Sequence, residues 1–223
     1  MKRIILTLCF AVSLLFCFGQ RSNAVSNFKG GFRAGLTTSQ ISGDNLGGFH
    51  QVGACAGVSA NIPLNDELDW KLQVEMDFVM KGSHSFVERN QVYNPAQKYV
   101  LYLGYVEIPV LMKWNFGKRI TINGKPVVNG FELEFGPVLG VKAYQLEKDW
   151  TGVIPATVDN GRMFRRFELS AMAGLGYLFK EHHGISLRYS NSLIPVRIPN
   201  WAYDRLTQKQ FNSVIMASYY YQF

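Results

Sequence analysis

Apolar and polar side chains alternate with a period of two residues along nearly the whole length of this chain. Between residues 70 and 80 every even position is apolar, from Trp70 to Met80, whereas the odd positions are polar except at Val79. Successive side chains of a β-strand point to opposite faces, so this pattern predicts a strand with one apolar face. No stretch after residue 24 reaches the roughly 18 consecutive apolar residues of a membrane-spanning helix.

The same test predicts eight strands in all. They span residues 28–37, 52–62, 70–80, 106–116, 131–143, 167–179, 185–190 and 211–223. Pro137 lies inside the fifth strand and predicts a bulge there, because proline has no N–H to donate to a neighbouring strand.

The connections between these strands differ in length. Those at 63–69 and 180–184 are short, and 117–130, with Asn123-Gly124 as a turn signal, is intermediate. The longer ones are 38–48, 82–98, 145–165 and 190–209. Short turns at one rim and long loops at the other are typical of an outer-membrane barrel.

Residues 1–24 form a targeting segment rather than part of the fold. Lys2 and Arg3 precede a largely apolar run, and Ser22-Asn23-Ala24 offers small residues for cleavage, which indicates a secretory signal peptide. The apolar run is short for a membrane anchor, and Phe16 fits a lipoprotein signal at Cys17 poorly.

Removal of this segment changes the net charge and the number of cysteines. The whole chain has 23 Lys and Arg against 16 Asp and Glu, and three of the bases leave with the signal. The remaining excess is too small to indicate a nucleic-acid partner, and an exported protein would meet none. Cys55 then stands alone, so no internal disulfide is expected.

Alternation alone fits a soluble barrel, whose apolar face is inside, or a membrane barrel, whose apolar face is outside. Three features favour the second: glycines concentrate on the polar faces, aromatics end the apolar faces, and the chain finishes on an aromatic residue. The aromatic residues predicted to form an interfacial girdle at one rim are Phe28, Trp70, Trp114, Phe116, Phe179 and Phe223. Residues 25–223 are therefore expected to be an all-β, eight-stranded antiparallel transmembrane β-barrel of the outer membrane, with a periplasmic amino end.

Two segments resemble a known family. The run Tyr105-Val-Glu107-Ile108-Pro109-Val-Leu-Met-Lys113, which follows Trp70-Lys-Leu-Gln-Val-Glu75-Met, is similar to the PorT-type porin-family barrels of the Bacteroidetes. The opening Gly31-Phe-Arg-Ala-Gly-Leu36 and the terminal Phe223 are similar too. The resemblance covers the whole mature chain and implies an integral outer-membrane protein, with an accessory role in protein secretion as one of the functions found in that group. It also implies that the assembly machinery recognises Phe223.

Charged residues on the polar faces are the strongest candidates for a site. Ionised groups in a narrow lumen are unfavourable unless they are paired, so a network of ion pairs is expected inside the barrel. Its predicted members are Arg33, Lys71, Glu75, Asp77, Glu107, Lys113, Glu132, Glu134 and Arg188. The network either seals the lumen or lines a narrow path for small solutes; eight strands enclose little more than side chains, which favours the seal.

Enzymatic chemistry has weaker support. Glu132 and Glu134 are a pair of carboxylates on one strand face, and His84 between two serines in a predicted outer loop suggests a lipid hydrolase. No nucleophile, base and orienting group come together in the sequence, and the adjacent His182 and His183 diverge too far to bind one metal. We expect no catalytic, cofactor or metal site.

The last long loop is a candidate contact surface. Arg197, Trp201 and Tyr203 lie among restrictive prolines, an arrangement that suits either a contact with a protein or glycan, or a loop that packs on itself and caps the barrel. The expected partners are outer-membrane lipid, the assembly machinery and, through the loops, secretion-system or surface proteins.

Overall fold

The computed structural model describes residues 29–43, 48–64, 70–84, 100–116, 118–122, 125–149, 152–153, 164–179, 182–197 and 209–223. The predicted signal peptide, Phe28, Trp201 and Tyr203 therefore lie outside the described residues.

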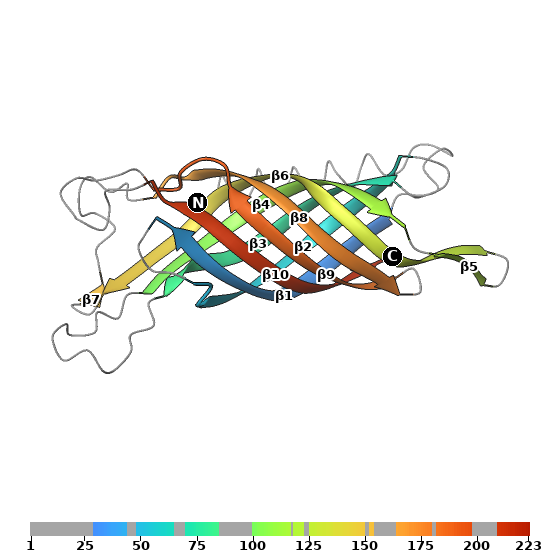
Figure 1. Cartoon of the computed structure of the whole chain (residues 1–223), viewed down its shortest axis with the longest axis horizontal. Helices are drawn as coiled ribbons and strands as arrows, with labels where there is room; N and C mark the ends of the chain where they lie inside the picture. Colours follow the sequence, from blue (N-terminus) through green and yellow to red (C-terminus); the bar gives the residue numbers. More distant parts are fainter. Residues whose placement is uncertain are drawn as a thin grey trace, which may run out of the picture.

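The described residues form ten strands, and eight of these build a closed wall (Figure 1). The wall strands are β1 (Lys29–Ser42), β2 (Gln51–Pro63), β3 (Trp70–His84), β4 (Val100–Asn115), β6 (Lys125–Asp149), β8 (Phe167–Phe179), β9 (His183–Ser192) and β10 (Phe211–Gln222). Each pairs antiparallel with its neighbours in chain order, and β10 pairs with β1 to close the sheet. The prediction of an eight-stranded antiparallel barrel is confirmed.

The other two strands lengthen β6 at its two ends. β5 (Lys118–Ile122) pairs with the first residues of β6, and β7 (Gly152–Val153) pairs with its last two. In Figure 1 they project from opposite ends of the barrel. We call the end that carries β5 and the C-terminal Phe223 the turn end, and the opposite one the loop end.

Pro137 does not produce a bulge. It lies opposite Ala171 on β8 in an unbroken register, and the register on both sides of it is also regular against β4. The only register shift between β4 and β6 falls at Gly104/Tyr105, nearer the loop end. The wall tolerates the missing donor of proline without inserting a residue, because the pairs on either side hold the register.

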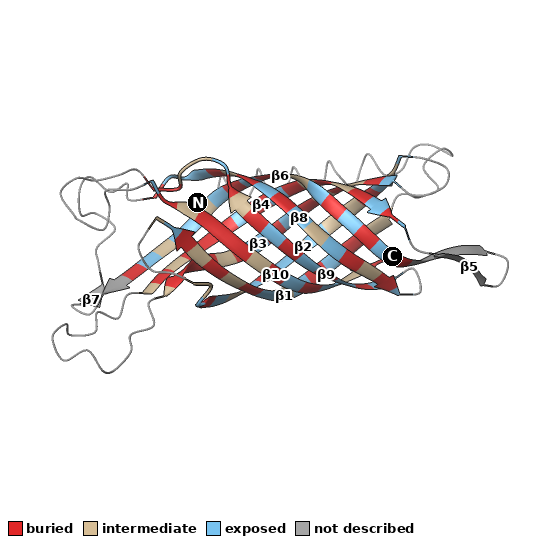
Figure 2. Cartoon of the chain, viewed as in Figure 1, coloured by how far each residue is buried: buried red, intermediate tan, exposed pale blue. Residues whose placement is uncertain are grey.

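Apolar side chains cover the outside of the wall, and charged side chains are buried inside it. Buried and exposed residues alternate along the wall strands (Figure 2). Phe32 is 49% exposed, whereas the next residue, the inward-facing Arg33, is 3% exposed. This distribution is the inverse of a soluble protein, in which large exposed apolar surfaces are rare and buried charges need partners.

The interior also contains a layer of apolar side chains, composed of Cys55, Val79, Leu111, Val138, Met172, Val214 and Met216. On β3, Val79 lies between the inward-facing Asp77 and Lys81. On β10, the layer residues lie between Ser218 and Asn212. This apolar layer therefore separates polar groups at two levels of the lumen.

A second apolar group occupies the loop end and consists of Ile41, Leu101, Leu103, Tyr105, Phe164 and Val196. Within the described part of the chain, no helix has the length and apolar character to cross a membrane.

Candidate functional site

Thirteen charged side chains are buried inside the described part of the barrel, six basic and seven acidic. They are Arg33, Lys71, Glu75, Asp77, Lys81, Glu107, Lys113, Glu132, Glu134, Glu147, Glu168, Arg188 and Arg197. The structure thus brings all nine predicted lumen residues into the interior, together with four others. They form clusters at three levels of the lumen and one pair at the loop end.

The central cluster is organised by Arg188 on β9. Its Nη1 and Nη2 lie 2.7 and 2.9 Å from the two carboxylate oxygens of Glu75 on β3. Nη2 also donates to Glu134 Oε2 at 2.8 Å, and Nε donates to the other oxygen of Glu134. A planar guanidinium suits this arrangement because it presents several donors in fixed directions.

Arg33 on β1 completes the central cluster. Its Nη1 lies 3.0 Å from Glu75 Oε2 and 3.7 Å from Asp77 Oδ2, and its Nη2 donates to the hydroxyl of Ser218. Glu75 is thus shared by two arginines from different strands, which compensates its complete burial.

The turn-end cluster is centred on Glu132. Lys71 Nζ and Lys113 Nζ lie 3.2 and 3.3 Å from its two oxygens, and the Tyr220 hydroxyl donates to Oε2 at 2.8 Å. Lys113 Nζ also lies 3.2 Å from Glu134 Oε2. Lys113 therefore joins the turn-end cluster to the central one.

The loop-end cluster lies beyond the apolar layer. Lys81 Nζ is 2.5 Å from Glu107 Oε1 and 3.0 Å from Glu168 Oε1. Asn212 donates to Glu168 Oε2 at 2.8 Å. Glu107, predicted as a network member, thus pairs with a lysine that the sequence analysis did not include.

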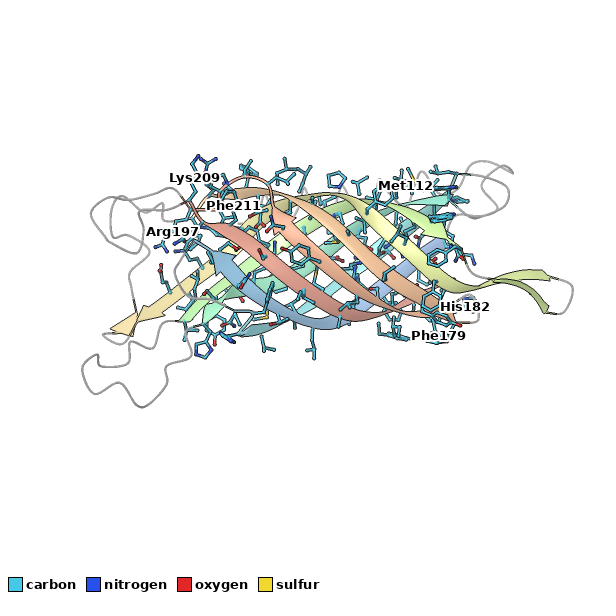
Figure 3. The ribbon with its side chains drawn as sticks, in the orientation of Figure 1. Met112, Phe179, His182, Arg197, Lys209 and Phe211 are labelled. Carbon is cyan, nitrogen blue, oxygen red and sulfur yellow. The ribbon has the colours of Figure 1, made fainter. Side chains whose placement is uncertain are left out.

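Arg197 belongs to the interior rather than to an exposed contact loop. It is 3% exposed, its Nη1 lies 3.2 Å from Glu147 Oε1, and its guanidinium stacks 4.6 Å from the centre of the Phe164 ring. Its backbone bridges Phe164 and Gln210, which draws the loop segments together over the loop end (Figure 3). The expectation of an external contact at this side chain is wrong, because the Glu147 carboxylate holds it inside.

Sequence periodicity alone did not identify further participants, which are Lys81, Glu168, Tyr220 and the Glu147–Arg197 pair. The first three lie on the polar parity of their strands: Lys81 lies one residue beyond the predicted strand 70–80, whereas Glu168 and Tyr220 lie within predicted strands. Glu147 could not be identified in this way, because the register shift at Gly104/Tyr105 interrupts the alternation of β6 before that position.

An aromatic chain runs around the outside of the turn end. Trp70 and Trp114 stack at 5.8 Å between ring centres, and Trp114 lies 5.4 Å from Phe116. Phe131 and Tyr177 then link Phe116 to Phe179, at successive distances of 6.0, 5.0 and 4.7 Å. Phe223, 67% exposed, lies at the same end, where its N–H donates to Gly30 O at 2.9 Å.

The described histidines lie at or next to strand ends. His84 is the last residue of β3, not a loop residue as expected. His182 contacts the backbone oxygen of Gln222 at 2.8 Å and His183 contacts the Tyr219 hydroxyl at 2.5 Å. No group of three or more metal-binding side chains occurs among the residues described.

Comparison with solved structures finds small barrels at low sequence identity. The chain is similar to the attachment invasion locus protein Ail of Yersinia pestis at 12% identity and a TM-score of 0.43, covering 87% of this chain and 98% of Ail. It is also similar to Neisserial surface protein A, with 13% identity, coverages of 89% and 98% and a TM-score of 0.43. For OprG from Pseudomonas aeruginosa the identity is 11%, the coverages 87% and 95%, and the TM-score 0.36.

No curated protein matches the sequence significantly. The model of the family described as "Outer membrane protein beta-barrel domain" matches residues 18–197, well over half of the chain. That span includes the strands from which most of the buried network comes. The protein therefore belongs to the outer membrane protein beta-barrel domain family.

Proposed function

We propose that this outer-membrane protein is a sealed barrel that serves the cell envelope as a scaffold for interactions, and that it does not conduct solutes. The observation that carries the proposal is the Arg188–Glu75 pair, which joins opposite walls at the centre of the lumen. The apolar layer beside it supports the same conclusion, because ions cross a dry apolar constriction only at high energy.

Conductance tests the seal directly. The full mature chain, purified in detergent and inserted into planar lipid bilayers, is expected to give no steady single-channel current. A porin of the same fold in the same bilayers provides the positive control. A stable ohmic pore in the wild type would instead make the protein a narrow small-solute porin.

We further propose that the turn end faces the periplasm, with the amino end, and that the loop end faces the exterior. The aromatic chain from Trp70 to Phe179 supports this placement at a lipid interface, where such rings are enriched. Single cysteines introduced in loops at either end, probed in intact cells with a reagent that cannot cross the membrane, test it. Labelling from outside is expected only at the loop end.

The resemblance to PorT-type barrels motivates a more specific role as an accessory of protein secretion. A deletion strain would then accumulate unprocessed cargo, and restoration by the wild-type gene is the required control. Normal processing in the deletion strain would leave the scaffold role with surface components as partners. A lipid hydrolase is the enzymatic alternative; it predicts hydrolysis of lipid A or phospholipid that His84→Ala abolishes.

A further inference from the structure

One hairpin extends beyond the wall at the turn end. β5 continues β4 in the same register against β6, from Trp114 opposite Leu133 to Ile122 opposite Lys125. Five residue pairs of β5 and β6 lie past the end of β4, which is about 17 Å at the usual rise of a strand. In Figure 1 this hairpin stands clear of the barrel beside the C-terminus.

The hydrogen-bond pattern shows which backbone groups of β5 remain available. Phe116 N–H donates to Phe131 O at 3.1 Å, so this pair is hydrogen-bonded. Antiparallel pairs alternate between bonded and non-bonded, and the register continues without a shift, so the pair Arg119–Val128 and the pair Thr121–Pro126 are non-bonded. The backbone N–H and C=O of Arg119 and Thr121 therefore point away from β6.

The two long edges of the hairpin are not equivalent. Among the residues that the structure describes, β5 has β6 as its only strand partner, so its far edge is open. On the other edge, the backbone donor expected at position 126 is missing because the residue is proline. Proline on an edge prevents a further strand from pairing there. Only the β5 edge offers a regular row of donors and acceptors.

The positive charge of the hairpin favours an acidic partner. From residue 116 to residue 130 the chain contains Lys118, Arg119 and Lys125 and no Asp or Glu. A second copy of the hairpin would add only further positive charge beside Lys118 and Arg119, which is unfavourable. An acidic strand would complement them.

We infer that the open edge of β5 binds an extended acidic segment of a periplasmic protein, which adds as a further strand to the hairpin. Backbone hydrogen bonds at Arg119 and Thr121 supply the pairing, as in other strand-addition complexes. The basic residues supply the preference for an acidic partner. The periplasmic origin of that partner rests on the proposed orientation of the barrel, whereas the strand addition does not.

The test uses the full mature chain in detergent micelles and two defined probes. Both are fluorescent nine-residue peptides. In the acidic peptide Thr and Val alternate with Glu, and in the lysine peptide they alternate with Lys. The variant Thr121→Pro removes an outward N–H without breaking a bond to β6, and Thr121→Val at the same position keeps that N–H as the matched control. Equal unfolding temperatures of the two variants verify that the barrel itself is unchanged.

The acidic peptide is expected to bind wild type and Thr121→Val equally and to bind Thr121→Pro about tenfold more weakly, as the loss of a backbone bond and a steric block imply. Amide exchange at Arg119 and Thr121 should slow when it binds. The inference is overturned if the acidic peptide fails to bind wild type, if the lysine peptide binds as well, or if Thr121→Pro has no effect.

Other occupants give different results. Crosslinking between Arg119→Cys chains without peptide would identify a second copy as the occupant. Binding to anionic vesicles but not to the peptide would identify lipid. Either result would overturn the inference. Labelling of Arg119→Cys from outside intact cells would overturn the proposed orientation but leave peptide binding in micelles intact, so the two failures are distinguishable.

Discussion

Arg188 on β9 and Glu75 on β3 pair across the full width of the barrel, with three strands between them in either direction around the wall. Their two hydrogen bonds of 2.7 and 2.9 Å tie opposite walls of the barrel together. This contact cross-links the network, and the proposed seal of the lumen rests on it.

Replacing Arg188 by Met is expected to lower the free energy of unfolding by about 3–5 kcal/mol, since Glu75 loses its bidentate partner and Glu134 loses two donors while both stay buried. Urea titration of the folded fraction in micelles measures this change. Arg166→Met, at an exposed position, is the control and should change stability by less than about 0.5 kcal/mol. Equal effects of the two substitutions would contradict a central role for Arg188.

Glu107→Ala is expected to lower the unfolding temperature without opening the lumen. Lys81 then keeps Glu168 as its only carboxylate among the described contacts, whereas the apolar layer and the central cluster remain in place. Thermal unfolding and bilayer recordings on the same preparation separate these two effects. A large conductance in this variant would mean that Glu107 itself is the barrier.

Two glycines on the same face of β8 provide a matched comparison. A methyl group at Gly174 would lie 2.7 Å from Arg188 Cγ and 2.9 Å from Leu187 O, so Gly174→Ala must displace the arginine or the backbone of β9. A methyl group at Gly176 would meet nothing closer than 3.4 Å. Gly174→Ala should therefore lower the unfolding temperature clearly and Gly176→Ala much less; the reverse order would contradict the packing described.

Cys55 reports on water in the apolar layer. Its side chain is buried in that layer, so a charged thiol reagent should leave it unmodified in the folded wild type and modify it after denaturation. Substituting both Met172 and Met216 by Ser should hydrate the layer and speed modification of the folded protein. Rapid labelling of folded wild type would show that the lumen is wet and the seal incomplete.

Deleting Phe223 separates assembly from stability. The residue contributes one backbone bond, to Gly30 O, so its loss should change the unfolding free energy in micelles by only about 1 kcal/mol. If the assembly machinery recognises this residue, the amount of folded barrel in the outer membrane should fall severalfold. Equal amounts of the truncated and full chains in the membrane would refute that recognition.

Much of this protein was determined by sequence alone because strand parity is local. Alternation in 70–80 assigned Trp70 to one face of its strand and Lys71, Glu75 and Asp77 to the other without knowledge of any other strand, and the structure places them on opposite faces. The eight strands followed from the same periodicity, whereas the membrane barrel also required the loop lengths, the glycines and the aromatic residues. The bulge predicted at Pro137 was wrong, because the residue pairs around the proline keep the register regular despite its missing N–H.

The pairing of the buried charges depends on long-range contacts between strands. Arg188 contacts Glu75 because closure of the sheet sets β9 opposite β3 at the same level, and that level depends on the register of all the strands between them. Arg197 is buried because the loop segments pair over the loop end and bring it to Glu147. Such contacts join residues far apart in sequence, and a periodicity with no information on relative register cannot specify them.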